Sequence, residues 1–214
     1  MYERFNDKSY FEAVKMELTD EQSVEEAFKD CTYVIHTASP YPFKNPKNED
    51  DVLQPAVEGT KSILDKCKNH QVKKVVVTSS IHSIIDYNRE GERNKFFEGN
   101  EPPEITRNTS TYAKSKLQAE EAVKSFISEL PDQEKFDVVI LNPGYMFGPL
   151  FYNHHCTSED IFVKILLGRF PGLPDIYLPT VDVRDVAEAH YKAIVEDLKY
   201  EQYIIAKGKL KLFV

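Results

Sequence analysis

Short runs of β-branched and aromatic residues alternate along this chain with longer stretches in which apolar residues recur every three or four positions. The short runs predict β-strands, and the longer stretches predict amphipathic helices. Their alternation is typical of a parallel sheet whose strands are joined by crossover helices. We therefore expect an α/β fold.

The clearest predicted strand is Lys74–Thr78, because its nearly continuous apolar β-branched residues suit a strand that is buried on both faces. A second strong strand, Asp137–Leu141, is expected to break at Asn142-Pro143-Gly144. The remaining predicted strands are Phe11–Leu18, Thr32–Thr37 and Gln202–Ala206.

Predicted helices fill the stretches between these strands. Asp20 opens the first helix, which runs to about Lys29, and Asp185 is expected to cap the last helix, which runs to about Leu198. The others are Val52–Asn69, Thr109–Leu130 and Ser158–Leu167. Two long segments remain, a charged one over 81–108 and one over 145–179 that is rich in aromatic residues, glycine and proline, and we expect both to line a ligand site.

Composition narrows the class of protein. Hydrophobic residues make up 41% of 214 residues, so the chain can bury a core, and it has no apolar run long enough for a bilayer. The net charge of -8 disfavours nucleic acid as a partner. The N-terminal residues lack the apolar stretch of a signal peptide, and three widely spaced cysteines do not form a disulfide framework. We expect a cytoplasmic protein with no membrane partner.

A tyrosine and a lysine share one face of the predicted helix over 109–130. Tyr112 and Lys116 are four residues apart, so their side chains emerge about one turn from each other. An ammonium beside a phenol lowers the pKa of the phenol and prepares it for general acid-base catalysis. The spacing alone is common, since 12 tyrosines and 27 basic residues produce it about once or twice by chance. Tyr203 and Lys207 have the same spacing, but they lie on a predicted strand, where four residues span roughly 13 Å. These two side chains are therefore too far apart to cooperate.

The neighbouring strand ends supply the context. Thr78, Ser79 and Ser80 lie at the carboxyl end of the most buried strand, where open α/β sheets bind ligands. A serine there can donate a hydrogen bond to a carbonyl oxygen. On these grounds alone two interpretations stay open: a catalytic group of serine, tyrosine and lysine, or serines that only end a strand beside a surface tyrosine.

Five motifs occur in the order and spacing of a known family. They are Thr37-Ala38-Ser39-Pro40, Val76-Val77-Thr78-Ser79-Ser80, Tyr112 to Lys116, Asn142-Pro143-Gly144 with Gly148-Pro149, and Val181 to Ala187. Over about Phe11 to Ala206 the chain resembles the extended short-chain dehydrogenases/reductases of the NAD-dependent epimerase/dehydratase superfamily. It is most similar to the dihydroflavonol reductase, cinnamoyl-CoA reductase and methylglyoxal reductase branch.

The resemblance implies a role for each member of the catalytic group. Ser80, in preference to Ser79, would polarise a substrate carbonyl, and Tyr112 would donate its proton. Lys116 would hold the nicotinamide ribose and depress the pKa of Tyr112. The expected activity is NAD(P)-dependent interconversion of an aldehyde or ketone and its alcohol. The same residues also serve sugar-nucleotide epimerases and 3-beta-hydroxysteroid dehydrogenases, which remain an alternative.

The resemblance also implies where a cofactor would lie, with NADP(H) favoured over NAD(H). Glu17 and Leu18 would meet the adenine ring, and Thr37 to Ser39 the diphosphate and ribose, while Pro143 and Tyr145 would meet the nicotinamide. The full implied set is Glu17, Leu18, Thr37, Ala38, Ser39, Thr78, Tyr112, Lys116, Asn142, Pro143, Gly144 and Tyr145. A homodimer is compatible with the family. No metal is expected, since the adjacent His154, His155 and Cys156 lack a second cluster.

One family feature is not found. The first glycine of the chain is Gly59, within a predicted helix, so the glycine-rich turn that holds a dinucleotide is lacking. The strand Phe11–Leu18 would match the family's third strand. We therefore expect a Rossmann-like doubly wound parallel sheet without its first β-α-β unit and with a gap at its middle, in a chain truncated at both ends.

This arrangement would divide the chain into an incomplete dinucleotide-binding domain over 1–144 and a partial, interleaved substrate-binding region over 145–214. It leaves two hypotheses, an active reductase or a module that is catalytically incompetent because it does not bind cofactor.

Overall fold

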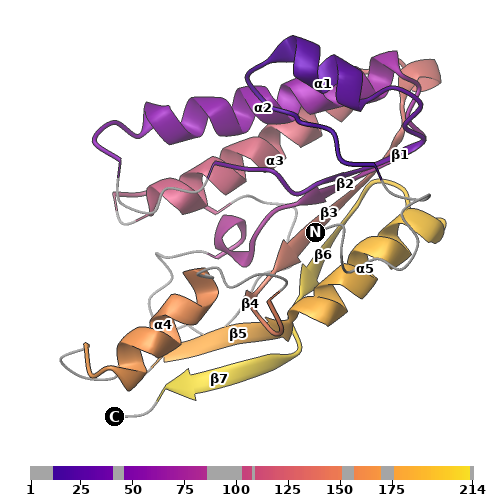
Figure 1. Ribbon diagram of the computed structural model, residues 1–214. Helices are drawn as coiled ribbons and strands as arrows, with labels where there is room; N and C mark the ends of the chain where they lie inside the picture. Colours follow the sequence, from indigo (N-terminus) through magenta and orange to yellow (C-terminus); the bar gives the residue numbers. More distant parts are fainter. Residues whose placement is uncertain are drawn as a thin grey trace.

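A computed structural model describes residues 12–40, 46–85, 103–107, 109–150, 157–169 and 176–212. Its centre is a four-stranded parallel sheet with helices on both faces (Figure 1). The strand order is β1-β2-β3-β6, formed by Tyr33–His36, Lys74–Thr78, Asp137–Pro143 and Glu201–Ile205. The expected Rossmann-like α/β fold is confirmed.

Three helices cover one face of this sheet, and a fourth covers the other (Figure 1). The first three are α1 (Glu21–Ala27), α2 (Asp50–Asn69) and α3 (Thr111–Glu129), and the fourth is α5 (Val183–Val195). Asp20 and Ser110 accept hydrogen bonds from backbone N–H groups in the first turns of α1 and α3, which explains why these helices begin there.

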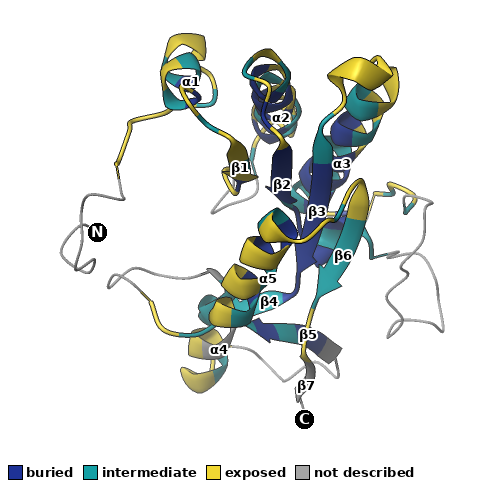
Figure 2. Cartoon of the chain, turned by 90° about the vertical axis from the view of Figure 1, so that its right-hand side faces the viewer, coloured by how far each residue is buried: buried dark blue, intermediate teal, exposed yellow. Residues whose placement is uncertain are grey.

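The core has two parts, one on each face of the sheet (Figure 2). Alternate residues of β2 divide between them, because successive side chains of a strand point to opposite faces. Val75 and Val77 face α1, α2 and α3, where Leu64 and Val123 are fully buried, whereas Val76 faces α5. Burial on both faces explains why this strand is apolar throughout.

A second, three-stranded sheet lies beyond the carboxyl end of β3. It consists of β4 (Tyr145–Phe147), β5 (Ile176–Asp182) and β7 (Gly208–Leu212), in the order β4-β5-β7. β4 is parallel to β5, and β7 is antiparallel to it. Helix α4 (Thr157–Leu166) lies beside this sheet, and short 3-10 helices occur at Ile81–Ser83 (η3) and Asp132–Glu134 (η4). Sequence analysis predicted none of these three strands.

The expected strand at Phe11–Leu18 is wrong over the residues that the structure describes. Residues 12–17 have no regular secondary structure, and residues 18 and 19 form a turn. The Ser23 hydroxyl accepts from the Glu17 N–H and lies 3.2 Å from the Glu17 carbonyl, which ties this segment to α1 rather than to a sheet. The expected gap in the sheet is also absent from the described residues, because the four strands are contiguous and β1 is the edge.

Two element ends differ from expectation. Asp182, not Asp185, caps α5, because the Asp182 carboxylate accepts from the backbone N–H of Arg184 at 2.8 Å. β3 does not stop at Leu141 but continues through Pro143, whose position pairs with Ile205 of β6. Among the described residues, no helix combines the length and the hydropathy that crossing a membrane requires.

Candidate active site

Helix α3 carries Tyr112 and Lys116 toward the carboxyl end of β2. The Lys116 ammonium donates to the backbone carbonyl of Thr78 at 3.2 Å, and its nitrogen lies 5.9 Å from the centre of the Tyr112 ring. The predicted pair therefore shares one helix face, and its lysine touches the strand end that was expected to form the site.

Burial changes the charge state of Lys116. Desolvation lowers the pKa of Lys116 to about 8, and the carboxylate of Glu120 partly opposes this effect. An amine with this pKa exchanges between ammonium and amine near neutral pH. Such a group can adjust the field around a neighbouring phenol during proton transfer.

Ser80 begins the 3-10 helix η3, directly after β2. Its hydroxyl oxygen accepts from the N–H of His82 at 3.2 Å, so its own hydrogen remains for donation. Ser79 differs, because its hydroxyl lies 3.3 Å from the Ser83 hydroxyl. Both serines are buried, and this difference makes Ser80 the better placed donor.

Ser80 and Tyr112 line one cavity of about 260 Å³. Its walls come from η3, the start of α3, the β3–β4 junction and α4, and the lining residues are Ser79, Ser80, Ile81, His82, Tyr112, Pro143, Gly144, Tyr145, Met146 and Ser158. The cavity therefore unites the strand-end serines, the tyrosine and the turn after β3.

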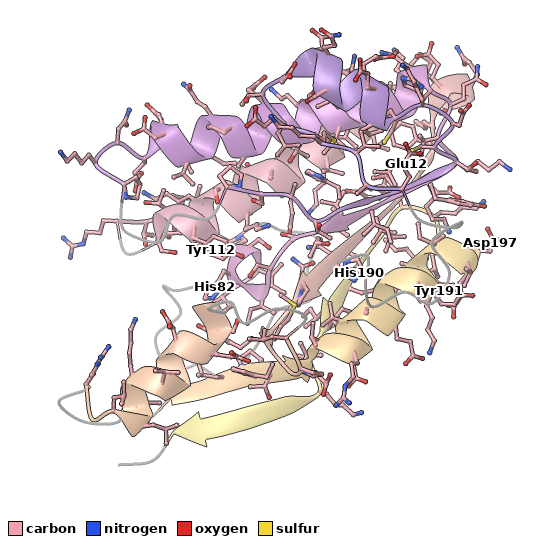
Figure 3. The ribbon with its side chains drawn as sticks, in the orientation of Figure 1. Glu12, His82, Tyr112, His190, Tyr191 and Asp197 are labelled. Carbon is pink, nitrogen blue, oxygen red and sulfur yellow. The ribbon has the colours of Figure 1, made fainter. Side chains whose placement is uncertain are left out.

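Sequence analysis missed His82, which lies next to Tyr112 (Figure 3). Its ring meets the rings of Tyr112 and Tyr145 edge-to-face, with centres 5.8 Å and 5.7 Å away. Burial lowers the pKa of His82, which favours the neutral imidazole. His82 lies in the segment over 81–108, which was expected to line a ligand site, but nothing in the local sequence distinguished it from its neighbours. Residues 86–102 and 108 of that segment lie outside the described part of the chain.

The turn after β3 approaches the second sheet closely. A Cβ atom on Gly144 would lie 2.5 Å from the carbonyl oxygen of Pro179, so only glycine fits there. Pro143, Gly144 and Tyr145 line the cavity, as expected for a cofactor site. Asn142 does not, because its side chain is fully buried and bonded within the protein.

The residues expected near the adenine and diphosphate do not gather at one site. Thr37 and Ala38 line a separate hollow of about 280 Å³ with Met16 and Ile35, while Ser39 is half-buried. Glu17 is exposed, and Leu18 packs against Gly59 of α2. The structure does not bring Glu17 or Leu18 into this hollow.

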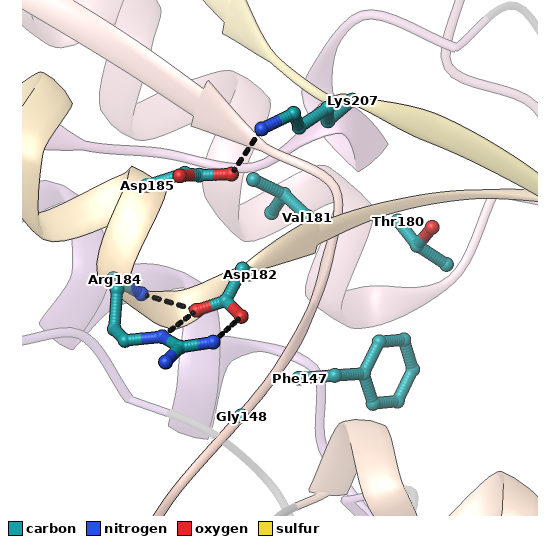
Figure 4. Close-up of a pocket in the computed structure, with 8 residues that line it drawn as sticks. All are labelled: Phe147, Gly148, Thr180, Val181, Asp182, Arg184, Asp185 and Lys207. Atoms are coloured by element: carbon teal, nitrogen blue, oxygen red, sulfur yellow. Dashed lines mark hydrogen bonds and ion pairs between the residues drawn. The ribbon is translucent and has the colours of Figure 1, made fainter.

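A second hollow, of about 610 Å³, lies between β4, the end of β5 and the start of α5 (Figure 4). Its charged groups are paired with one another. Arg184 binds both carboxylate oxygens of Asp182, at 2.9 Å and 2.6 Å, and Lys207 lies 3.4 Å from Asp185. These exposed pairs neutralise each other, so the hollow has no unbalanced charge for a ligand.

Over the described ranges, no three histidine, cysteine or acidic side chains gather as metal ligands would. His154, His155 and Cys156 lie outside these ranges.

Comparison with known proteins identifies the family of this chain. A model of the 3-beta hydroxysteroid dehydrogenase/isomerase family matches residues 2–200. The chain belongs to this family. It is 34% identical over 180 residues to the NADPH-dependent methylglyoxal reductase GRE2 of Saccharomyces cerevisiae, covering 77% of this chain and 53% of that protein. Cinnamoyl-CoA reductase 1 of Petunia hybrida is 33% identical over 178 residues, covering 82% and 51% respectively.

The fold agrees with these relatives. The crystal structure of the yeast methylglyoxal/isovaleraldehyde reductase Gre2 complexed with NADPH superimposes with a TM-score of 0.78 at 29% identity, covering 91% of this chain and 63% of that chain. The expected membership in the extended short-chain reductases, on the methylglyoxal and cinnamoyl-CoA reductase side, is confirmed. The chain spans about half the length of the curated relatives that it matches.

The described residues fit one end of the cofactor that this family implies. Tyr112, Lys116 and the Pro143–Tyr145 turn provide phenol, ammonium and backbone for a nicotinamide and its ribose. The diphosphate end fits poorly. Thr37 and Ala38, which were expected near the diphosphate, line a hollow separate from the cavity, and α2, the next helix along the chain, begins with Asp50 and Asp51, whose charges repel a phosphate from its N-terminus.

Proposed function

We propose that this chain carries the catalytic group of a nicotinamide-dependent carbonyl reductase. The supporting observation is that Ser80 and Tyr112 line the same cavity while the Lys116 amine lies close behind the Tyr112 ring. Membership in a family whose relatives include NADPH-dependent reductases supports the same reaction.

In this proposal the Ser80 hydroxyl donates a hydrogen bond to the carbonyl oxygen of the substrate, which makes the carbonyl carbon more electrophilic. Reduced nicotinamide, when bound, supplies the hydride that adds to this carbon. Tyr112 transfers its proton to the oxygen, so that hydride and proton together convert the carbonyl to an alcohol. Lys116, as an ammonium, stabilises the phenolate that remains and donates toward the ribose.

The substrate proposed is a small aldehyde or ketone. A cavity of about 260 Å³ lies just below the range of roughly 300 to 1,000 Å³ for small-molecule sites, so only a small substrate fits it. Ile81, Pro143 and Met146 contribute apolar surface to its wall, which suits a hydrophobic substituent on the carbonyl. NADP(H) is the proposed cofactor, because the yeast relative is NADPH-dependent and its crystal structure is a complex with NADPH.

The test combines cofactor titration with one substitution. Tyr112→Phe keeps the ring in the cavity but removes the transferable proton, so we expect turnover to fall by about 10² to 10⁴-fold with little change in NADPH affinity. Turnover is followed by NADPH absorbance with methylglyoxal, and affinity by nicotinamide fluorescence. Unchanged turnover in Tyr112→Phe would contradict the proposal.

A second candidate function, a family module that is catalytically incompetent because it does not bind cofactor, is favoured by the acidic first turn of α2. The same titration separates the two. Saturable NADPH fluorescence supports the reductase, and the absence of any saturable change up to millimolar NADPH supports the module.

A further inference from the structure

Glu120 is a buried carboxylate that the catalytic steps above do not use. It lies on α3, one turn beyond Lys116, and only 2% of its surface is exposed. Tyr112, Lys116 and Glu120 therefore follow one another at intervals of four residues along a single helix face. Burying an acidic side chain is unfavourable unless its oxygens are fully hydrogen-bonded.

Three side chains from three other elements bond the Glu120 carboxylate. Ser83 of η3 and Asn142 of β3 each approach Oε1 at 2.6 Å, and Gln202 of β6 donates to Oε2 at 3.0 Å. None of these partners carries a charge. Among the described residues, the carboxylate thus joins α3 to the ends of two strands and to the helix that follows Ser80.

The same network reaches the catalytic serine. Asn142 Nδ2 donates to the backbone carbonyl of Ser80 at 2.9 Å, and the Ser83 hydroxyl lies 2.6 Å from that carbonyl. Glu120 therefore contacts both groups that hold Ser80 in place. A shift of the Glu120 carboxylate would move the segment from Ser80 to Ser83, here called the Ser80 loop, relative to Tyr112.

The charge of Glu120 acts on Lys116. The groups that face the Lys116 ammonium are Tyr112 and Glu120 on its own helix, His36 of β1 and the Thr78 carbonyl of β2. Of these, Glu120 raises the pKa of Lys116 against the larger effect of burial. Its field also reaches Tyr200, where burial is the larger cause of a raised pKa.

We propose that Glu120 is a positioning residue with two effects, fixing the Ser80 loop against α3 and keeping Lys116 in its ammonium form. The catalytic consequence rests on the proposed function, whereas the effect on Lys116 does not. Because Ser83, Asn142 and Gln202 are neutral, none of them is a cation that competes with Lys116, one turn away, for the Glu120 carboxylate.

Two variants separate the effects. Glu120→Gln removes the charge and places an amide opposite three donor groups, whereas Ser83→Ala removes the hydroxyl that contacts Glu120 and the Ser80 carbonyl and leaves the charge in place. Glu121→Gln, on the exposed neighbouring position, is the matched control. The Lys116 titration is followed by NMR with lysine labelled with ¹³C at Cε, assigned by Lys116→Arg, and catalysis by kcat and KM for methylglyoxal with NADPH.

We expect Glu120→Gln to move the Lys116 titration midpoint to lower pH and to reduce kcat about 10 to 100-fold, with KM changed by less than about threefold. Ser83→Ala should leave the midpoint in place and reduce kcat alone, and Glu121→Gln should change neither. An unchanged midpoint in Glu120→Gln, or full kcat in Ser83→Ala, would overturn the proposal.

Thermal unfolding shows whether each variant folds. If Glu120→Gln does not fold, the kcat of Ser83→Ala tests the positioning effect on its own. If the unmodified chain has no reductase activity, the proposed function fails, and the Lys116 midpoint still tests the electrostatic effect of Glu120.

Discussion

At the scale of single residues, protonation of His36 opposes folding. It is 6% exposed at the end of β1, and burial, together with the nearby Lys116 charge, lowers the pKa of His36 to about 4. In the unfolded chain its pKa is about 6.5. The unfolded chain therefore binds more protons between pH 4 and pH 6.5.

This difference makes stability fall as the pH falls through that window. The full contribution of neutral His36 is present above pH 6.5, and about 3 kcal/mol is lost on reaching pH 4. We expect the free energy of unfolding of the unmodified chain, relative to His36→Gln, to drop by this amount between pH 7 and pH 4. Urea denaturation at a series of pH values measures it, and parallel curves for the two proteins would contradict it.

The candidate site was partly predictable at this scale, because Tyr112 and Lys116 show their relation through helical spacing alone. Glu120 continues the same spacing, yet a charged residue on a helix usually faces water, so its burial was not foreseeable. Asn142 was expected to contact the cofactor, but its side chain forms hydrogen bonds with the Glu120 carboxylate and the Ser80 carbonyl instead. The side chains of this network come from four separate elements, so no short stretch of sequence reveals that they are partners.

At the scale of elements, the strands and helices of the parallel sheet were predictable, and the strands of the second sheet were not. Strand β2 is a continuous apolar run because it is buried on both faces, and helices α2 and α3 each bury one periodic face, so both patterns are visible in the sequence. Strands β4, β5 and β7 form through pairing with distant residues, and β4 has only three residues. Such strands depend on tertiary contacts that no short window contains.

The start of α5 gives a prediction at this scale. Two aspartates, Asp182 and Asp185, lie near it, and only Asp182 bonds the Arg184 N–H. We expect Asp182→Ala to lower the melting temperature by about 2 to 4 °C, since a lost N-cap bond destabilises a helix. Asp185→Ala loses only an exposed pair with Lys207 and should stay within about 1 °C. Circular dichroism melts compare the variants, and a larger effect in Asp185→Ala would restore Asp185 as the cap.

At the scale of the whole molecule, the two faces of the sheet differ in how well they are covered. Helices α1, α2 and α3 cover one face as far as β1, whereas α5 covers β2 and β3 on the other (Figure 2). Ile35 pairs with Val76 and therefore points to the face of α5, where it is 46% exposed, and Tyr33 on the same face is 47% exposed. Tyr191 and Val195 of α5 are also exposed.

β1 adds a second feature to this surface, because among the described residues it pairs only with β2. A strand edge with unpaired backbone groups beside exposed apolar side chains is a template for association. The net charge of -8 opposes association by general repulsion, and salt screens that repulsion. We therefore expect the chain to self-associate at high protein concentration, and more strongly at 0.5 M than at 0.05 M salt.

Ile35→Lys should weaken this association by placing a charge on the exposed edge, while Leu166→Lys is the matched control. Leu166 is 85% exposed on α4, away from β1, so its replacement changes net charge equally but leaves the edge intact. Sedimentation velocity over a concentration series measures the effect. Equal weakening by both variants would assign it to net charge, and no association of the unmodified chain at high salt would contradict the role of the β1 edge.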